Sequence, residues 1–203
     1  MPVYCTVPSP VGELLLAADD AGLTGVYFAE HRHGPGPGAP GVEPTGAGAS
    51  HSATTWTPAE AQPGAADDVL AEARAQLARY FAGELTAFTL PLAARGTPFQ
   101  ARVWRALGDI PFGATISYAE LARRVGDPAA VRAVGGANAR NPLSVVVPCH
   151  RVVGADGSLT GFGGGVERKR WLLAHEARHQ MGGPTSLSRS DQALPLPAFA
   201  LWP

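Results

Sequence analysis

The first half of the chain alternates short apolar runs with turn-forming segments. Residues 3–7, 13–18 and 23–28 each have strand length, and they are separated by Pro-Ser-Pro-Val-Gly and Asp-Asp-Ala-Gly. This pattern predicts three antiparallel strands joined as a meander. The run TAFTLPL at 86–92 is interpreted as a further strand.

Between these runs the apolar spacing becomes helical. From Asp67 onward, apolar residues recur every three or four positions until Gly83, which predicts one amphipathic helix. A helix beside a strand meander indicates an α/β domain over residues 1–92.

The second half predicts mostly helices. Thr97–Gln100 and Ser117–Glu120 have the form of capping boxes, and each precedes an apolar face. Asp127-Pro128 begins a third helix that continues to about Asn138. Two short helices joined by a Gly-Asp-Pro turn are typical of a helix-turn-helix. A valine-rich strand at 145–147, a glycine-rich loop and a last helix at 166–177 complete a domain over 96–178.

Two segments lack any such pattern. Residues 31–64 are rich in Gly, Pro, Ala and Thr, and we assign this insertion no structure. Residues 179–203 are expected to be a flexible tail.

Composition narrows the class of protein. An apolar fraction of 45% describes a globular chain, and no stretch has the roughly 18–20 apolar residues that a membrane span needs. The N-terminus lacks the basic and apolar regions of a secretory signal. The two cysteines, Cys5 and Cys149, are far apart and make no disulfide framework, so a cytoplasmic protein is expected.

Charge is divided between the halves. Residues 1–96 carry four arginines against ten acidic residues, whereas residues 97–178 carry eleven basic residues against six acidic ones. A basic second domain suits a polyanion such as DNA, although ordinary scatter of surface charge explains a difference of this size equally well.

Cys149 is the first candidate for chemistry. Taken alone, a cysteine in an apolar run is more often a buried structural residue. Pro148 interrupts the run just before it, however, and His150 follows directly. Adjacent residues on an extended chain point to opposite faces, so contact through a turn or a bridging water is expected. Glu176 on the last helix can orient the imidazole, which is what activation of a thiol requires; otherwise it is a solvated carboxylate.

The third helix of the second half, PAAVRAVGGANAR, consists almost entirely of small residues around Arg132. Two glycines inside a helix cost about 1 kcal/mol each relative to alanine. Tight packing against another helix explains such a face. In the second position of a helix-turn-helix, close approach to DNA is the better interpretation.

PCHRVV, preceded by RAVGGA and NP and followed by WLLAHE, resembles the O6-alkylguanine-DNA alkyltransferases, also called methylated-DNA–protein-cysteine methyltransferases. The resemblance covers 97 to about 177 and, more loosely, the first half. It implies a ribonuclease-H-like N-terminal domain and a winged-helix-like, helix-turn-helix C-terminal domain. It also implies repair of O6-alkylguanine, and of O4-alkylthymine, by irreversible transfer of the alkyl group to a cysteine. The partner is double-stranded DNA, from which the damaged nucleotide is flipped, and the protein is expected to be a monomer.

The same resemblance assigns roles to residues. The catalytic set is Cys149 as nucleophile, His150 as its base through a water, Glu176 and Asn141 as its network, and Tyr118 as proton donor to the leaving guanine. The DNA-binding set is Arg132, which fills the gap in the stack, with Tyr118, Ala130, Ala133, Gly135, Arg140 and Arg151. The base pocket is lined by Val147, Val152, Ser158 and Phe162, which stands where some members carry tyrosine.

No cofactor and no metal are implied. Some members of the family hold zinc near the N-terminus, but beside Cys5, His31 and His33 a second cysteine is missing. Three other functions stay open on the residues alone. The chain could be a damage-recognition protein without catalysis, a Cys-His-Glu hydrolase of acyl groups, or a DNA-binding regulator with an incidental cysteine.

Overall fold

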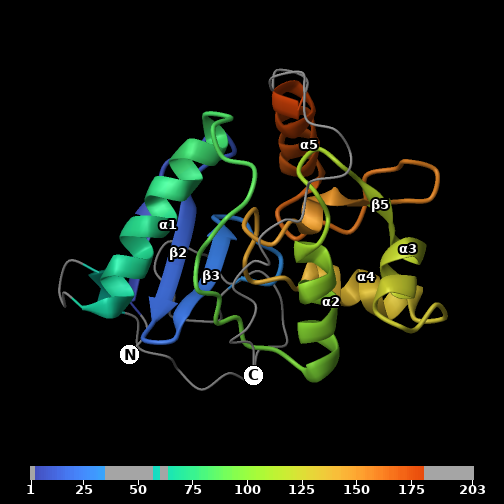
Figure 1. The fold of residues 1–203 in the computed structure, drawn as a ribbon, viewed down its shortest axis with the longest axis horizontal. Helices are drawn as coiled ribbons and strands as arrows, with labels where there is room; N and C mark the ends of the chain where they lie inside the picture. Colours follow the sequence, from blue (N-terminus) through green and yellow to red (C-terminus); the bar gives the residue numbers. More distant parts are fainter. Residues whose placement is uncertain (1–2, 35–56, 60–63, 181–203) are drawn as a thin grey trace, which may run out of the picture.

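The computed structural model describes residues 3–34, 57–59 and 64–180. Strands β1 (Val3–Val7), β2 (Leu14–Asp19) and β3 (Gly22–Phe28) form the antiparallel meander that the sequence predicts. Helix α1 (Ala65–Phe81) packs across this sheet, at the left of Figure 1.

Alternation along the strands explains this packing. Leu14 and Leu16 join Leu70 and Leu77 of α1 in the main core, whereas Leu15 belongs to a small separate cluster with Tyr27.

Two expectations for the first half were wrong. Thr57 and Pro58, inside the segment that we assigned no structure, form strand β4, which pairs in parallel with β1. Most of that segment, 35–56 and 60–63, lies outside the described residues. The predicted strand at 86–92 is an irregular segment that makes only an isolated bridge between Leu92 and Leu23.

A side chain replaces strand pairing in the segment 86–92. Gln76 of α1 accepts a hydrogen bond from the Thr89 backbone N–H and donates one to the Thr89 hydroxyl, both 2.9 Å long. Pro91 has no N–H to donate to a ladder. The Thr89 backbone N–H therefore has a partner without a regular strand.

The second half is helical, as predicted. It contains α2 (Pro98–Gly108), the short strand β5 (Ile116–Ser117), α3 (Tyr118–Arg124) and α4 (Val131–Ala139). Thr97 and Gln100 form the complete capping box of α2. Ser117 accepts from the backbone N–H of Glu120, while the Glu120 carboxylate pairs with arginines at the end of α3.

Helix α4 begins at Val131, later than expected. The Asp127 side chain accepts a hydrogen bond from the Ala129 N–H and its carbonyl accepts one from Ala130, so residues 127–130 form a turn. Part of the small-residue face of α4 packs against α2, where Trp104 donates a 2.9 Å hydrogen bond to the Ala137 carbonyl. Close packing against α2 therefore explains the small residues on this side of α4.

The valine-rich run is not a strand. Val145 has a φ of 72°, in the left-handed region that a β-branched residue rarely adopts, and Val147 N–H bonds to the Leu143 carbonyl. A turn therefore leads into the 3₁₀ helix η2 (Cys149–Arg151), which is followed by β6 (Val152–Val153) in parallel with β5.

The two halves meet along the free edge of β3. Val26 donates to the Pro142 carbonyl at 2.7 Å and accepts from Ser144 N–H at 3.1 Å. These bonds attach the segment before Cys149 to the N-terminal sheet.

Helix α5 (Val166–Gln180) completes the fold (red in Figure 1) and extends two residues beyond the boundary expected for the tail. Residues 181–203 lie outside the described residues. None of the helices in the described ranges is long and apolar enough to span a membrane.

Candidate active site

Cys149 stands at the start of η2, directly after Pro148, and is 2% exposed. Asn141 Nδ2 donates hydrogen bonds to its Sγ, at 3.1 Å, and to the Val147 carbonyl, at 2.8 Å. Asn141 Oδ1 in turn accepts from the Leu143 backbone N–H at 3.0 Å. The amide is therefore fixed from both sides, and its N–H group is directed at the sulfur.

Burial raises the pKa of the Cys149 thiol, and the Asn141 hydrogen bond opposes this shift only in part. The resting cysteine is thus a neutral thiol. It needs a base if it is to act as a nucleophile near pH 7.

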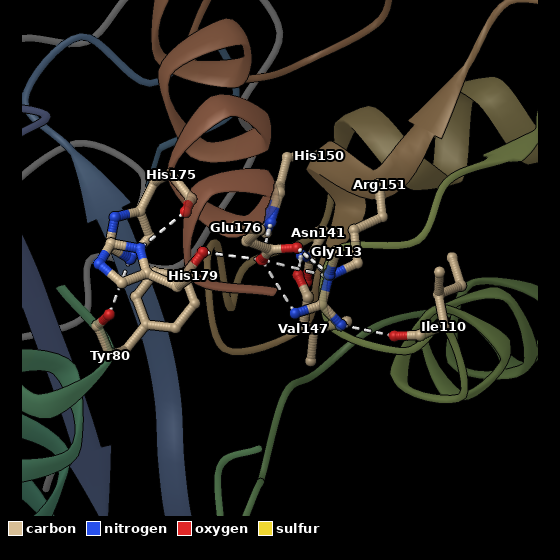
Figure 2. A network of polar contacts seen from close by, with 10 residues as sticks. All are labelled: Tyr80, Ile110, Gly113, Asn141, Val147, His150, Arg151, His175, Glu176 and His179. Atoms are coloured by element: carbon tan, nitrogen blue, oxygen red, sulfur yellow. Dashed lines mark hydrogen bonds and ion pairs between the residues drawn. The ribbon is translucent and has the colours of Figure 1, made fainter. Parts of the chain in front are cut away.

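His150, the next residue in the chain, is the base that the sequence predicts. It is fully buried, and its Nε2 lies 2.8 Å from Oε1 of Glu176 (Figure 2). Its Nδ1 is also buried and has no hydrogen-bond partner among the described residues. Burial lowers the pKa of His150, and the Glu176 carboxylate opposes that change. The imidazole is therefore neutral near pH 7, with one nitrogen held and the other free to accept a proton.

Glu176 is the centre of the polar network drawn in Figure 2. Besides His150, it accepts hydrogen bonds from the Tyr80 hydroxyl at 2.8 Å and the Gly113 backbone N–H at 2.9 Å. Burial alone would raise the pKa of this carboxyl, but the contacts with His150 and Arg151 hold it well below its usual value. A carboxylate that is ionised near pH 7 thus faces His150, as the family resemblance implied, and is not the solvated carboxylate that the residues alone also allowed.

The prediction that Arg151 contacts DNA disagrees with its position. Arg151 is 6% exposed, and its Nε lies 2.9 Å from Oε2 of Glu176, while Nη2 bonds to Oε1 at the same distance. Its Nη1 donates to the Ile110 carbonyl. In the 3₁₀ turn this side chain points into the protein, where its charge neutralises Glu176.

Tyr118, at the start of α3, is half-buried, and its hydroxyl donates a 2.8 Å hydrogen bond to the Thr160 carbonyl. Burial raises its pKa. A side chain at Gly161, whose φ is 68°, would collide with the Tyr118 hydroxyl. The glycine-rich loop therefore closes directly over the phenol.

Sequence reasoning missed Lys169. It is fully buried, and its Nζ donates to the carbonyls of Val152, at 2.5 Å, and Thr160, at 2.7 Å. Nζ also lies 5.8 Å from the centroid of the Tyr118 ring. Burial lowers the pKa of Lys169 to about 8. The available signal was composition, because Lys169 is the single lysine in a chain with fifteen arginines.

Helix α4 presents the expected DNA-binding residues to solvent. Arg132, Ala133 and Arg140 are exposed, and Ala130 and Gly135 are half-buried. Gly135 faces the Tyr118 ring, so the small residues of α4 lie beside the proposed proton donor.

The four residues predicted to line a base pocket do not share one environment. Val147 and Val152, which precede and follow Cys149 in the sequence, are fully buried. Phe162 is 7% exposed and packs edge-on against Phe28. Ser158 is exposed at the tip of the loop, where its backbone bonds to Gly154 and its side chain lies close to it.

No group of three potential metal ligands of the His, Cys, Asp or Glu type occurs within 3–34, 57–59 and 64–180. Cys5 is half-buried on β1.

A helix-turn-helix domain that carries a buried cysteine next in sequence to a His–Glu pair, joined to a small α/β domain, has the features of a DNA-binding protein with a candidate nucleophile. Residues 98–178 match the family model described as "6-O-methylguanine DNA methyltransferase, DNA binding domain", and residues 3–94 match the "ribonuclease-like domain" of the same family. The chain belongs to the 6-O-methylguanine DNA methyltransferase family, which confirms the resemblance and the predicted fold class.

Individual relatives agree with this assignment. The chain is 47% identical over 188 residues to the methylated-DNA–protein-cysteine methyltransferase of Mycolicibacterium paratuberculosis, covering 93% of this chain and 98% of that protein. It is 42% identical to the protein of the same name from Methanosarcina acetivorans, covering 85% and 97%. A solved structure of Mycobacterium tuberculosis OGT in complex with DNA is similar with a TM-score of 0.71 and 45% identity, covering 87% of this chain and 94% of that one.

Proposed function

We propose that the chain repairs alkylated DNA by moving the alkyl group from O6 of guanine to Cys149, and that each molecule reacts once. The observation that carries this proposal is the buried thiol beside His150 and Glu176 in a domain of the DNA-binding type. A thioether formed at this sulfur is stable to water, so the protein is consumed.

The thiol proton leaves toward His150. Nε2 of this residue is held by Glu176, so Nδ1 accepts the proton, through one bridging water. The sulfur then forms its bond to the alkyl carbon as the bond between that carbon and O6 breaks, and the electron pair goes to the guanine. Glu176 stabilises the imidazolium that results.

The departing guanine needs a proton, and Tyr118 supplies it to ring nitrogen N3. The ammonium of Lys169, 5.8 Å from the Tyr118 ring centroid, stabilises the phenolate that remains. The phenolate later recovers a proton from His150 through solvent, which restores the charge balance.

Helix α4 enters the minor groove, where small residues allow close approach and Arg132 replaces the flipped nucleotide in the base stack. Arg140 contacts the backbone phosphates, and Val147, Val152 and Phe162 line the base pocket. The ribonuclease-H-like domain comprises residues 1–92, and the DNA-binding alkyltransferase domain comprises residues 96–178. O4-alkylthymine is accepted by the same pocket. The protein acts as a monomer in the cytoplasm, where its two free cysteines stay reduced.

The decisive experiment measures intact mass after incubation with a duplex containing O6-methylguanine. We expect a gain of one methyl group in place of one hydrogen, localised to Cys149 by peptide mapping. The Cys149→Ser variant should gain nothing, and the matched Cys5→Ser variant should react like the unmodified chain.

Other outcomes identify the other functions. Tight binding of damaged duplex without an adduct would indicate recognition alone. Repeated turnover of an ester without an adduct would indicate a hydrolase. Equal binding of damaged and undamaged duplex without an adduct would indicate a regulator.

A further inference from the structure

The last turn of α4 carries a buried polar atom that the proposed reaction does not yet use. Asn138 is 1% exposed. Its Nδ2 donates hydrogen bonds to the Cys149 carbonyl at 3.3 Å and to the Gly161 carbonyl at 3.5 Å. Its Oδ1 is buried and accepts no hydrogen bond from any of the residues that the structure describes. A buried acceptor without a donor is uncommon in folded proteins and points to a role.

The orientation of the Asn138 amide follows from its partners. A backbone carbonyl only accepts hydrogen bonds, so the atom that faces both carbonyls is the nitrogen, and Oδ1 is directed away from them. Burial raises the pKa of Tyr118, and Asn138 is among the residues that oppose this rise. A nearby N–H group stabilises a phenolate in this way, whereas a carbonyl oxygen does not. Oδ1 is therefore the atom of the amide that lacks a partner.

Asn138 lies between the two residues that handle the base in the proposed reaction. It contacts the Cys149 carbonyl directly, and it contacts Gly161, at which a side chain would collide with the Tyr118 hydroxyl. Gly135, one turn earlier on the same helix, faces the Tyr118 ring. Cys149 meets the alkyl group on O6, and Tyr118 meets N3. The edge of guanine between O6 and N3 carries the 2-amino group.

We propose that Asn138 is a specificity-determining residue whose Oδ1 accepts a hydrogen bond from the 2-amino group of the alkylated guanine. This role rests on the alkyl-transfer function proposed above. The 2-amino group of guanine is a hydrogen-bond donor, and alkylation at O6 leaves N1 without its hydrogen. O4-alkylthymine has no N–H donor on the corresponding edge. Asn138 therefore favours the guanine lesion over the thymine lesion.

Entry of the base changes the contacts of the amide. Cys149 and Asn138 Oδ1 are both buried in the resting protein, so a base reaches them only when the segment around Gly161 moves. This movement breaks the 3.5 Å contact with the Gly161 carbonyl. The bond to the Cys149 carbonyl can remain, and it keeps the amide in the same orientation. Insertion of guanine then gives Oδ1 the donor that it lacks.

The first test compares two single-stranded oligonucleotides, one with O6-methylguanine and one with O6-methylhypoxanthine, which lacks only the 2-amino group. Single strands remove the difference in pairing with an opposite base. The unmodified chain should take the methyl group from O6-methylguanine about tenfold faster, a factor that corresponds to about 1.4 kcal/mol. The gain in intact mass with time measures both rates. Equal rates would overturn the proposal without any variant.

Asn138→Leu assigns the discrimination to this side chain. Leucine fills a similar volume and has no acceptor, so the ratio between the two rates should fall from about tenfold toward one. If Asn138 only supports the fold, the variant slows both reactions alike, and an unchanged ratio refutes the proposal. Should Asn138→Leu fail to fold, Asn138→Ala repeats the comparison without overpacking the site.

Val134→Ala is the matched control, because Val134 is fully buried on the same helix and has no polar side-chain atom. Its loss of packing should slow both reactions by the same factor and leave the ratio unchanged.

A third oligonucleotide, with O4-methylthymine, tests the choice between lesions. In Asn138→Leu the preference for O6-methylguanine over O4-methylthymine should fall by the same factor as the first ratio, and a fully retained preference would refute this choice. No transfer from any oligonucleotide to the unmodified chain would reject the repair function itself. Transfer with an unchanged first ratio in Asn138→Leu would reject only the role of Asn138.

Discussion

The hydroxyl of Tyr80, on α1, donates a 2.8 Å hydrogen bond to Oε1 of Glu176, on α5. Both residues are fully buried, and the same carboxylate oxygen lies 2.8 Å from His150. The N-terminal domain therefore completes the polar network behind the proposed base. Tyr80 also contacts Phe88, Phe112 and His175, so its ring joins the core of both halves.

Tyr80→Phe should reduce both stability and reactivity. A hydrogen bond to a buried charged group contributes about 1.5–3 kcal/mol, and the phenyl ring keeps the packing. We expect the free energy of unfolding to fall by an amount in this range, and methyl transfer to slow several-fold as Glu176 becomes less firmly placed. Urea unfolding and single-turnover kinetics measure the two effects.

Tyr27→Phe is the matched control for this prediction. Tyr27 is 8% exposed and belongs to the small cluster on the other face of the sheet. Removal of the Tyr27 hydroxyl should leave the rate of methyl transfer unchanged. Equal slowing in both variants would mean that Tyr80 acts through general stability.

Arg151 provides a second prediction, because its buried ion pair replaces the DNA contact expected from the sequence. Arg151→Met leaves the Glu176 charge without its main partner, and breaking a buried pair costs about 3–5 kcal/mol. We expect a large drop in the urea midpoint. The salt dependence of binding to undamaged duplex, measured on the folded fraction, should stay the same.

Arg140→Ala should behave in the opposite way. Arg140 is exposed, so its removal should leave the urea midpoint nearly unchanged. A lost phosphate contact should reduce the slope of log affinity against log salt by about 1. A reduced slope in Arg151→Met would restore the DNA-contact interpretation.

These residues show how far the sequence could lead. PCHR and LLAHE identified Cys149, His150 and Glu176, and the structure brings His150 and Glu176 into contact. Tyr80, Gly113 and Lys169 could not be assigned in the same way, because each reaches the site through packing between distant segments. The direction of Arg151 depends on the 3₁₀ turn after Pro148, which the apolar pattern did not reveal.

The prediction of secondary structure failed for a similar reason. Residues 86–92 and 145–147 have the composition of strands. The backbone of Thr89 instead bonds to the Gln76 side chain, and the Val147 N–H bonds to the Leu143 carbonyl inside a turn. Apolar residues in both segments enter the core without a ladder, and composition does not distinguish the two cases.

Acid should destabilise the protein in two stages. Burial lowers the pKa of His150, His31 and His175, so below about pH 6.5 the unfolded chain binds more protons than the folded one. The pKa of Glu176 is also lowered, and this carboxyl adds a further loss below about pH 4.3. The free energy of unfolding should therefore decrease as the pH falls through each window.

Urea unfolding at a series of pH values from 7.5 to about 2.5 checks this sign in both windows, because stability rises with pH wherever the unfolded state binds more protons. His150→Gln removes one titrating group and should flatten the dependence between about pH 6.5 and 5. The same slope in this variant and in the unmodified chain would show that His150 is not the residue responsible.

Arg132 supplies the prediction that best separates DNA handling from chemistry. Its side chain is exposed near the start of α4 and is not part of the hydrogen-bond network of Figure 2. If it fills the gap left by a flipped nucleotide, it stabilises an extrahelical state that otherwise costs a few kcal/mol. Arg132→Ala should then slow transfer from duplex O6-methylguanine by about tenfold or more, since 1.4 kcal/mol corresponds to a factor of ten. Reaction with the free base O6-benzylguanine needs no extrusion and should continue at the original rate.

Arg123→Ala, which removes an exposed arginine of α3, is the matched control and should slow the reaction of neither substrate by this factor. Equal losses on duplex and free base in Arg132→Ala would reject the extrusion role and place its effect on the thiol or on the fold.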